Sequence, residues 1–331
     1  MIITRTPFRV SFFGGGTDYP TWFQRNGGVV LATSIDKYCY ISCRYLPQFF
    51  DHKYRIVYSR IENVRDISEI QHPAARAVLD VLDCNDGLEI HHDGDLPARS
   101  GLGSSSSFTV GLINAIMALR GKYISKEDLA SQAIHIEQQV IRENVGSQDQ
   151  ISAAFGGLNR IEFRRDGSFD VSPIVLPIER LAVLQSHLML CFTGLSRISS
   201  DVAKSTIENL DQRENELKLM QGLVDQAISV LQSRTASVEE FGKLLHESWM
   251  YKRQLSDKVS TSEIDELYDA ARKMGAIGGK LLGAGGGGFF LLFVRPEHQK
   301  EIREKLSRLV HVPFRFESAG SRVVLYQPSG L

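Results

Sequence analysis

One segment, PARSGLGSSSSF at residues 97–108, joins a glycine turn directly to the start of an apolar helix. Gly101 and Gly103 allow the backbone to turn tightly and to approach a ligand closely. Ser104 to Ser107 then begin the helix that the run SSFTVGLINAIMALRG predicts. Because a helix N-terminus presents unpaired N–H groups and the positive end of its dipole, this turn suits a polyphosphate. On these residues alone, an ordinary serine-capped helix explains the segment equally well.

Two other phosphate-binding motifs are excluded by spacing and context. The segment GAIGGK, which ends at Lys280, lacks the G-x-x-x-x-G-K-[ST] spacing of a P-loop and continues with Leu281. Gly283, Gly285 and Gly288 have the letters of G-x-G-x-x-G, but the run FFLLFV after them predicts a strand. Since a dinucleotide-binding loop leads into a helix, this cluster gives no support to an oxidoreductase.

Composition restricts the class of protein. The chain has 331 residues, which allows one large or two ordinary domains, and a formal net charge of −1, which gives no sign of nucleic-acid or membrane-surface binding. No apolar run reaches the roughly 18 residues of a spanning helix, and the N-terminal segment lacks the apolar core of a signal peptide. The four cysteines form no CxxC pair. We therefore expect a cytoplasmic protein without nucleic-acid or membrane partners.

Hydrophobic periodicity predicts an α+β chain of two domains. In the first half, strands are expected in MIITRT, FRVSFFGG, VVLATSI, KYCYISCRYL and GLEIHHDGDL, with helices near 71–83, 105–120 and 126–141. The second half is expected to hold the strand HLMLCFTG, a helical region at 198–234, helices near 238–255, 263–274 and 296–309, and the strands FFLLFV and RVVLY. The boundary falls near 165–182, where two prolines interrupt any period, so the domains are predicted at 1–175 and 176–331.

Two carboxylates in the first half are candidates for chemistry. In the helix after Ser125, Glu137 falls on the apolar stripe that contains Ala130, Ala133, Ile134 and Ile141. A carboxylate there costs free energy unless it is paired or binds a metal ion, so Glu137 is either a magnesium ligand or a structural residue. Asp149, which we expect in a loop, is either a general base or the N-cap of a short helix at 150–155.

Four segments of the chain occur in a recognisable order. They are TPFRVSFFGGGTDY, PARSGLGSSSS, ENVGSQDQ and KLLGAGGGG, and together they resemble the motifs of the GHMP small-molecule kinases, which include galactokinase and mevalonate kinase. The resemblance extends from Arg5 to about Val294 and is most specific in the first two segments. It implies an ATP-dependent kinase without a P-loop, with a ribosomal-protein-S5-like N-terminal domain and a ferredoxin-like C-terminal domain.

The resemblance also implies roles for individual residues, with ATP and Mg²⁺ as cofactors. Asp149 matches the catalytic aspartate of the family, and Arg9 matches the basic residue of its first motif. Ser105 and Glu137 would hold the magnesium ion. The ATP phosphates would be bound by Ser100, Gly101, Leu102, Gly103, Ser104, Ser105 and Ser106. The substrate would be bound by Gly15, Gly16, Thr17, Asp18, Arg197, Gly285 and Gly286.

The first motif also carries information about the substrate. Galactokinases have a Glu-His pair where this chain has Gly15-Gly16, so the sugar pocket lacks a carboxylate and suits an anionic substrate. With FFDHKYRIVYS and EIQHPAARAVL, the motif looks most like the D-glycero-D-manno-heptose 7-phosphate kinases of the family, which phosphorylate the C1 hydroxyl to give the 1,7-bisphosphate for GDP-heptose and surface polysaccharide. Candidates for holding the substrate phosphate are Lys37, Arg44, Lys53, Arg55 and Arg197.

Other functions and assembly states remain open at this point. The chain is alternatively another anomeric sugar kinase, such as an L-fucokinase, or a sugar- or nucleotide-binding homologue that has lost catalysis. Its residues are equally compatible with a monomer and with a homodimer.

Overall fold

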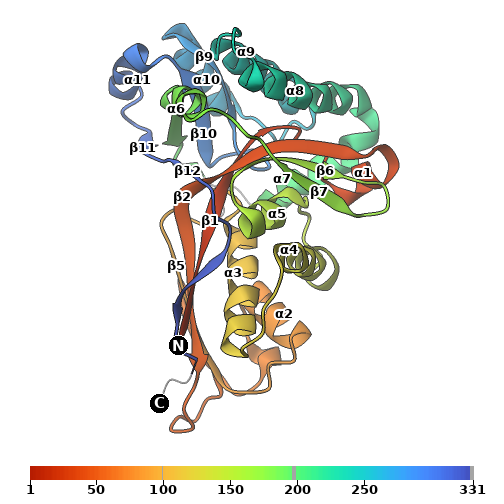
Figure 1. The fold of residues 1–331 in the computed structure, drawn as a ribbon, viewed down its shortest axis with the longest axis vertical. Coiled ribbons are helices and arrows are strands. Elements are labelled where there is room, and N and C mark those ends of the chain that lie inside the picture. The colour runs from red at the N-terminus through yellow and green to blue at the C-terminus, as the bar shows by residue number, and fades with distance from the viewer. Residues whose placement is uncertain (99, 196–198, 329–331) are drawn as a thin grey trace.

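The computed structural model of the chain describes residues 1–98, 100–195 and 199–328. It consists of two units, each with its own sheet, and the unit with the larger sheet occupies the lower part of the view in Figure 1. Helices gather on one side of the larger sheet, and the N-terminus lies at its lower end. This arrangement confirms the α+β fold that the periodicity predicted.

Within the described residues, nine strands form the larger sheet, in the order β13-β1-β2-β5-β3-β4, with β12 and the β6–β7 hairpin joined to β2. These strands are β1 (Ile2–Phe13), β2 (Gly28–Tyr45), β3 (Tyr54–Val57), β4 (Ile61–Val64), β5 (Leu88–Gly94), β6 (Leu158–Phe163), β7 (Phe169–Pro173), β12 (Phe316–Glu317) and β13 (Arg322–Tyr326). The smaller sheet is antiparallel, in the order β11-β8-β10-β9, and contains β8 (Leu188–Phe192), β9 (Ala276–Leu281), β10 (Phe289–Val294) and β11 (Val310–Val312).

The α-helices of the described residues are α1 (Pro20–Asn26), α2 (Pro73–Val81), α3 (Ser104–Leu119), α4 (Lys126–His135), α5 (Gln148–Phe155), α6 (Ile178–Ser186), α7 (Ser199–Asn209), α8 (Glu214–Gln232), α9 (Glu239–Gln254), α10 (Ser262–Lys273) and α11 (Gln299–Lys305). A π-helical turn, η2 (Ile136–Val140), continues α4, and short 3₁₀ turns occur at η1 (Ile67–Glu69), η3 (Leu210–Gln212) and η4 (Pro296–His298). Among these helices, none has the length and apolarity needed to cross a membrane.

Local sequence signals explain several helix boundaries. The hydroxyl of Ser125 accepts a hydrogen bond from the backbone N–H of Asp128 at 3.0 Å, as expected for the N-cap of α4. The N-cap of α10 is Thr261, so this helix begins at Ser262, one residue before the predicted start at 263. The helical region predicted at 198–234 contains two helices, α7 and α8, separated by η3.

The end of the chain returns to the larger sheet, although residues 176–331 were expected to form the second domain. Strand β13 pairs antiparallel with β1, with Ile2 opposite Tyr326 and Arg5 opposite Arg322. Strand propensity alone does not specify a pairing partner, because the partner is decided by the packing of side chains in the whole sheet. The first unit is therefore closed by residues from both ends of the chain.

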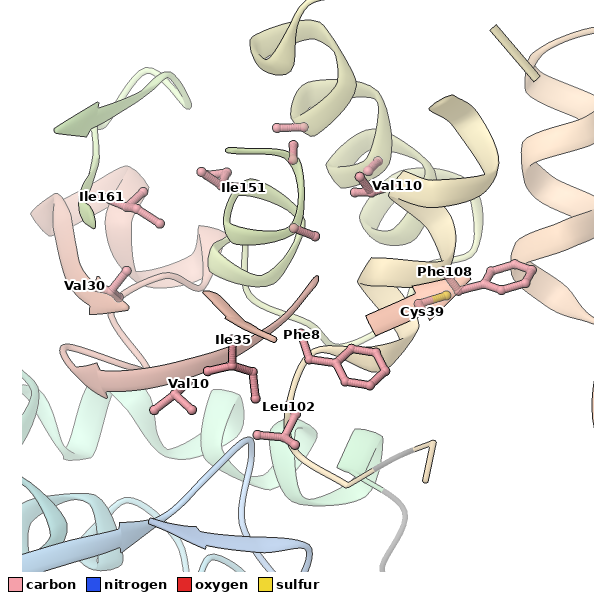
Figure 2. Close-up of a cluster of buried hydrophobic side chains, with 14 of the residues drawn as sticks. Phe8, Val10, Val30, Ile35, Cys39, Leu102, Phe108, Val110, Ile151 and Ile161 are labelled. Carbon is pink, nitrogen blue, oxygen red and sulfur yellow. The ribbon is translucent and has the colours of Figure 1, made fainter. Parts of the chain in front are cut away.

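Apolar packing fixes the position of the glycine-serine turn in the larger unit. Figure 2 shows Phe8 and Val10 of β1 close to Ile35 of β2 and to Leu102 of the turn. The Leu102 side chain is fully buried. The backbone carbonyl oxygen of Leu102 accepts a hydrogen bond from the backbone N–H of Arg9 at 3.0 Å. Burying a leucine stabilises a fold by about 1.5–3 kcal/mol, so this contact anchors the turn to β1.

Aromatic side chains join the two units. The ring of Phe241 in α9 meets the rings of Phe12 and Phe13, at the end of β1, edge to face, with centroid separations of 5.3 and 5.0 Å. Such pairs contribute beyond the area that they bury. The end of β1 therefore lies against the second unit.

The return of the C-terminal segment can be tested at a glycine. Gly156 (φ 70°, ψ 174°) and Gly27 (φ 72°, ψ 170°) follow helices with nearly the same backbone conformation. A Cβ on Gly156 would lie 2.1 Å from the carbonyl carbon of Ala319, whereas a Cβ on Gly27 would make an ordinary contact of 3.6 Å. We expect Gly156→Ala to lower the free energy of unfolding by about 2 kcal/mol or more beyond Gly27→Ala, as measured by urea denaturation. Equal losses would contradict this packing.

Candidate active site

The glycine-serine turn lies at the junction of the two units. The carbonyl oxygen of Ser100 accepts a hydrogen bond from the N–H of Phe289, the first residue of β10, at 3.1 Å. A Cβ on Gly283 would lie 2.5 Å from the Cα of Gly101, and a Cβ on Gly288 would lie 2.3 Å from the Ser100 carbonyl oxygen. The glycine run at 283–288 therefore packs backbone against backbone on the turn, which no larger residue permits.

The start of α3 has the geometry of an anion-binding turn. Gly103, its N-cap, has the left-handed conformation with φ 75° and ψ 25°. The first N–H groups of any helix lack partners inside the helix, and here they belong to a turn held from both units. Ser105 is exposed at this first turn, whereas Ser106 is buried. The turn can thus offer amides and hydroxyls to a phosphate group.

The structure brings Arg9 and Asp149 together across 140 residues of sequence. The Arg9 Nε donates to Asp149 Oδ1 at 2.7 Å, and Nη2 donates to Oδ2 at 2.8 Å. The Arg9 Nη1 also donates to the carbonyl oxygen of Gly101 at 2.6 Å. Charge-assisted bidentate pairs of this kind are strong and geometrically specific. A single guanidinium therefore sets the orientation of the carboxylate relative to the turn.

Asp149 faces the turn from the first turn of α5, although the sequence led us to expect a loop position. A Cβ on Gly103 would lie 3.4 Å from Asp149 Oδ2 and 3.4 Å from Arg9 Cγ. The Asp149 side chain is 25% exposed, while that of Arg9 is 5% exposed. The carboxylate is therefore the reachable member of the pair, and the arginine holds it from behind.

Glu137 is buried in the π-helical turn η2, close to the start of α3. Its Oε2 accepts hydrogen bonds from the Ser106 hydroxyl at 2.8 Å and from the Gln150 side-chain amide. Its Oε1 is buried and has no hydrogen-bond partner among the residues that the structure describes, and burial raises the pKa of this carboxyl to about 7. The resemblance implies Ser105 and Glu137 as magnesium ligands, and the structure adds Ser106 as a serine that contacts Glu137 directly. π-Helical turns often mark functional sites.

These residues fit a magnesium ion. Mg²⁺ prefers hard oxygen ligands and is usually bound through one or two carboxylates together with substrate phosphates. The unpartnered Oε1 of Glu137 supplies one such oxygen, and the exposed hydroxyl of Ser105 lies at the start of the same α3 helix. The donor set therefore matches a cation shared between protein and nucleotide.

The segment from Gly14 to Asp18 forms a buried turn beside Asp149. Asp18 Oδ1 accepts from the backbone N–H of Gly16 at 2.8 Å, and Oδ2 accepts from the Gln148 side chain at 3.0 Å. Burial, and then the nearby Asp149 carboxylate, raise the pKa of Asp18, against the hydrogen bonds it accepts. The Thr17 hydroxyl donates to the Gly14 carbonyl oxygen at 2.8 Å, which fixes the turn.

Gly15 and Gly16 differ in what surrounds them. A Cβ on Gly16 would lie 3.1 Å from Leu217, so a side chain of the second unit covers this turn, whereas a Cβ on Gly15 would meet Ser11 and Gln148 of the first unit.

Gly285 and Gly286 pack on Val259, whose carbonyl oxygen accepts the Gly286 N–H at 2.9 Å. Gly285 and Gly286 therefore shape the glycine run, while Gly283 and Gly288 contact the turn. Arg197, the other expected substrate residue, lies outside the described residues.

The remaining cations proposed for the substrate phosphate have other partners. Arg44 donates to Glu89 at 2.7 Å, and Arg55 lies 3.7 Å from the same carboxylate. In the register of β1 with β2, Arg9 lies opposite Ser34 and Ile2 opposite Cys43, so Arg44 is about 25 Å from Arg9 along the sheet. A role for Arg44 and Arg55 at the substrate phosphate stays a prediction, and in this structure both contact Glu89. Lys37 pairs with Asp36, and Lys53 lies over the Tyr54 ring.

Two buried lysines of the second unit were not identified from the sequence. Lys252 of α9 donates to the carbonyl oxygens of Leu281 and Gly283, and Lys280 of β9 donates to that of Phe12. A signal for Lys252 was present, because it continues the helical stripe of Phe241, Leu245 and Trp249 at the spacing that drew attention to Glu137. Lys280 ends the segment GAIGGK, whose spacing excludes a P-loop and gave no sign of another role.

Comparison with known proteins agrees with this architecture. Residues 69–157 match the family model of the GHMP kinases N-terminal domain, and residues 227–311 match that of the GHMP kinases C-terminal domain. A D-glycero-alpha-D-manno-heptose 7-phosphate kinase of Campylobacter jejuni is 29% identical over 319 residues, which is 93% of each chain. A bifunctional fucokinase/GDP-fucose pyrophosphorylase of Arabidopsis thaliana is 25% identical over 91% of this chain, which spans 30% of that protein.

A solved structure shares the whole fold. The crystal structure of a D-glycero-D-manno-heptose 1-phosphate kinase from Bacteroides thetaiotaomicron superposes with a TM-score of 0.80 and 22% identity, over 98% of both chains. Since the two family models together match more than half of the chain, the resemblance noted in the four sequence motifs is confirmed. The chain belongs to the GHMP kinase family and is an ATP-dependent sugar kinase.

Proposed function

We propose that this sugar kinase transfers the γ-phosphoryl group of ATP to the C1 hydroxyl of D-glycero-D-manno-heptose 7-phosphate, giving the 1,7-bisphosphate. The observation that carries the reaction is the Arg9–Asp149 pair, which holds a reachable carboxylate against the glycine-serine turn. The choice of sugar is supported by the heptose kinase relative, which aligns along nearly the whole chain, and by Gly15-Gly16 in the first motif.

Asp149 is the general base of the proposed reaction. It orients the acceptor hydroxyl and accepts its proton, and Arg9 holds the carboxylate directed toward the turn. Phosphoryl transfer depends mainly on positioning and on the stabilisation of charge at the transferring group. The Arg9 guanidinium, which also donates to Gly101, adds positive charge at that point.

The nucleotide phosphates are assigned to the turn from Ser100 to Ser106. Its backbone amides and serine hydroxyls bind oxygens of the phosphates, and the glycine run of the second unit holds the turn in place. Ser105 and Glu137 would hold Mg²⁺, and the ion supplies charge neutralisation for the β- and γ-phosphates. Ser106 orients Glu137 through its hydroxyl.

The sugar is assigned to the segment around Asp18, next to Asp149. Gly15, Gly16 and Thr17 of the first unit and Gly285 and Gly286 of the second are assigned to the substrate, with Arg197 as its cation. Asp18 is oriented by Gly16 and Gln148, so its carboxyl is placed to bind sugar hydroxyls.

A kinase that acts on L-fucose is the second candidate, because a plant fucokinase is 25% identical over most of this chain. Both sugars would be phosphorylated at C1 by the same groups. They differ in charge, since only the heptose carries a phosphate and requires a cation in its pocket.

A substrate panel tests the proposed sugar. We expect ADP release with heptose 7-phosphate to exceed that with free heptose or L-fucose by at least about 100-fold in kcat/KM, since a charged hydrogen bond contributes about 1.5–3 kcal/mol and a phosphate accepts several. A coupled assay with Mg²⁺-ATP measures this ratio. Equal or faster turnover of L-fucose would reject the heptose proposal.

The role of Asp149 is tested by Asp149→Asn. This substitution removes the base and keeps the shape, so we expect kcat to fall about 100- to 10,000-fold while ATP affinity changes little. Steady-state kinetics and calorimetry measure the two effects, with the exposed Asp80→Asn as the control. A fully active Asp149→Asn enzyme would remove this residue from the mechanism.

Glu137 predicts a pH dependence of stability without metal or nucleotide. Its folded pKa of about 7 lies above the ordinary value of 4.5, so the stability it contributes is complete below pH 4.5 and is lost as the pH rises through 7. We expect Glu137→Gln to avoid this loss. The difference in unfolding free energy between Glu137→Gln and wild type should therefore rise by about 3 kcal/mol, in favour of the variant, between pH 5 and pH 8.

Urea denaturation in EDTA measures this difference, and the exposed Glu266→Gln is the control. The same Glu137→Gln enzyme should need a much higher Mg²⁺ concentration for half-maximal activity. An unchanged magnesium requirement would argue against Glu137 as a ligand.

A further inference from the structure

Two buried lysines of the second unit have no role in the proposed function so far. Lys252 is 6% exposed and Lys280 is 2% exposed. The Lys252 Nζ donates to the carbonyl oxygens of Leu281 at 2.9 Å and Gly283 at 2.5 Å, and the Lys280 Nζ donates to that of Phe12 at 2.9 Å. In the described part of the chain, neither Nζ has a carboxylate within the 4.0 Å of an ion pair.

A buried ammonium without a counter-ion is costly. Carbonyl oxygens satisfy its hydrogen bonds but do not neutralise its charge. Burial, followed by the positive charge of Arg9, lowers the pKa of Lys252 to about 7, and only Asp18 acts in the opposite direction. The pKa of Lys280 is lowered by burial and by its neighbours Lys252 and Arg9. The junction therefore gathers basic groups whose charged forms its own carboxylates do not stabilise.

Lys252 contacts the glycine run that packs on the turn of the proposed phosphoryl-transfer site. It binds the carbonyl oxygen of Gly283, and Gly283 packs on Gly101 so closely that a Cβ would lie 2.5 Å from the Gly101 Cα. The carbonyl oxygen of Gly101 in turn accepts a hydrogen bond from Arg9 at 2.6 Å. Lys252 of the second unit thus binds Gly283 and Arg9 of the first unit binds Gly101, on the two sides of the contact between these glycines.

The neighbouring carboxyls do not serve as the missing counter-charge. Asp149 accepts two hydrogen bonds from Arg9, and the raised pKa of Asp18 reflects a carboxyl that resists ionisation in its buried turn. A loop anchor alone would not require a charge, since any neutral donor can bind two carbonyl oxygens. An ammonium has three donors, and Lys252 uses two of them on protein carbonyls.

We propose that Lys252 is a phosphate-binding residue, whose third N–H contacts an anionic oxygen of the phosphate group that enters the junction between the two units. The phosphate is either the γ-phosphoryl group of ATP or the phosphate carried by the sugar. This inference rests on the proposed function, because it takes the turn at Gly101 and the Asp149 carboxylate as the place of phosphoryl transfer.

Binding measurements distinguish the two sources of phosphate. Calorimetry compares a non-hydrolysable ATP analogue with ADP, and heptose 7-phosphate with free heptose, for wild type, Lys252→Met and Lys252→Arg. If Lys252 binds the γ-phosphoryl group, Lys252→Met weakens the ATP analogue about 10- to 100-fold and leaves ADP unchanged. If it binds the sugar phosphate, the same loss occurs for heptose 7-phosphate and not for free heptose.

Lys252→Arg separates charge from packing, because arginine stays protonated throughout. We expect it to retain the affinity for the phosphate-bearing ligand. The wild-type affinity should fall relative to that of Lys252→Arg as the pH rises through about 7, where Lys252 loses its proton. The ionisation of the ligand is the same in both proteins and does not affect this comparison. Lys243→Met, an exposed lysine of α9 that pairs with Glu240, is the matched control.

Two results would overturn the proposal. In the first, Lys252→Met binds all four ligands as tightly as wild type does. In the second, Lys252→Met loses the same amount of affinity for all four ligands. If Lys252→Met does not fold, the pH comparison between wild type and Lys252→Arg decides, and parallel pH profiles would overturn the proposal. Failure of the heptose proposal itself is recognised separately, as a wild-type enzyme that does not bind or phosphorylate heptose 7-phosphate, while the nucleotide measurements still test Lys252.

Discussion

The contact between two stretches of bare backbone is the constraint on which the rest of the site depends. The turn at Ser100–Gly103 and the run at Gly283–Gly288 approach so closely that a single Cβ on Gly283 would collide with Gly101. Because neither side carries a side chain at the contact, the second unit can hold the turn without filling the space that a ligand needs. The buried Leu102 anchors the turn to β1 from its other side, so its position is defined by both units.

The basic side chains at the junction between the two units lie where water is largely excluded. Arg9, Lys252 and Lys280 are buried, and Asp149 accepts a bidentate pair from Arg9. Interactions between charges are stronger where water is excluded, and an unbalanced charge there is correspondingly costly. A polyphosphate with its magnesium ion would complete the balance, which is why the same groups that make the apo junction unfavourable suit it to an anionic ligand.

The sequence predicted the functional segments better than their contacts. The turn at 97–108, the α3 and α4 helices and the buried position of Glu137 follow from local spacing, and the resemblance to GHMP kinases connected Arg9, Glu137 and Asp149. Ser106 rather than Ser105 contacts Glu137, because one step along a helix rotates a side chain by about 100°. The position of Arg44 relative to the site could not be predicted, because a basic residue on a strand gives no information about its distance from a site in another segment.

The sequence by itself determined the local chemistry: a glycine turn that leads into a helix, a carboxylate on an apolar stripe, and motifs that identify an ATP-dependent sugar kinase. These features depend on residues within a few positions of one another, so hydrogen bonding and periodicity along the chain are sufficient to recognise them. Only the tertiary structure decided that Arg9 meets Asp149, that β13 closes the first sheet beside β1, and that Lys252 lies buried behind Gly283. Those contacts join residues far apart in the chain, and their formation is decided by how whole sheets and helices pack.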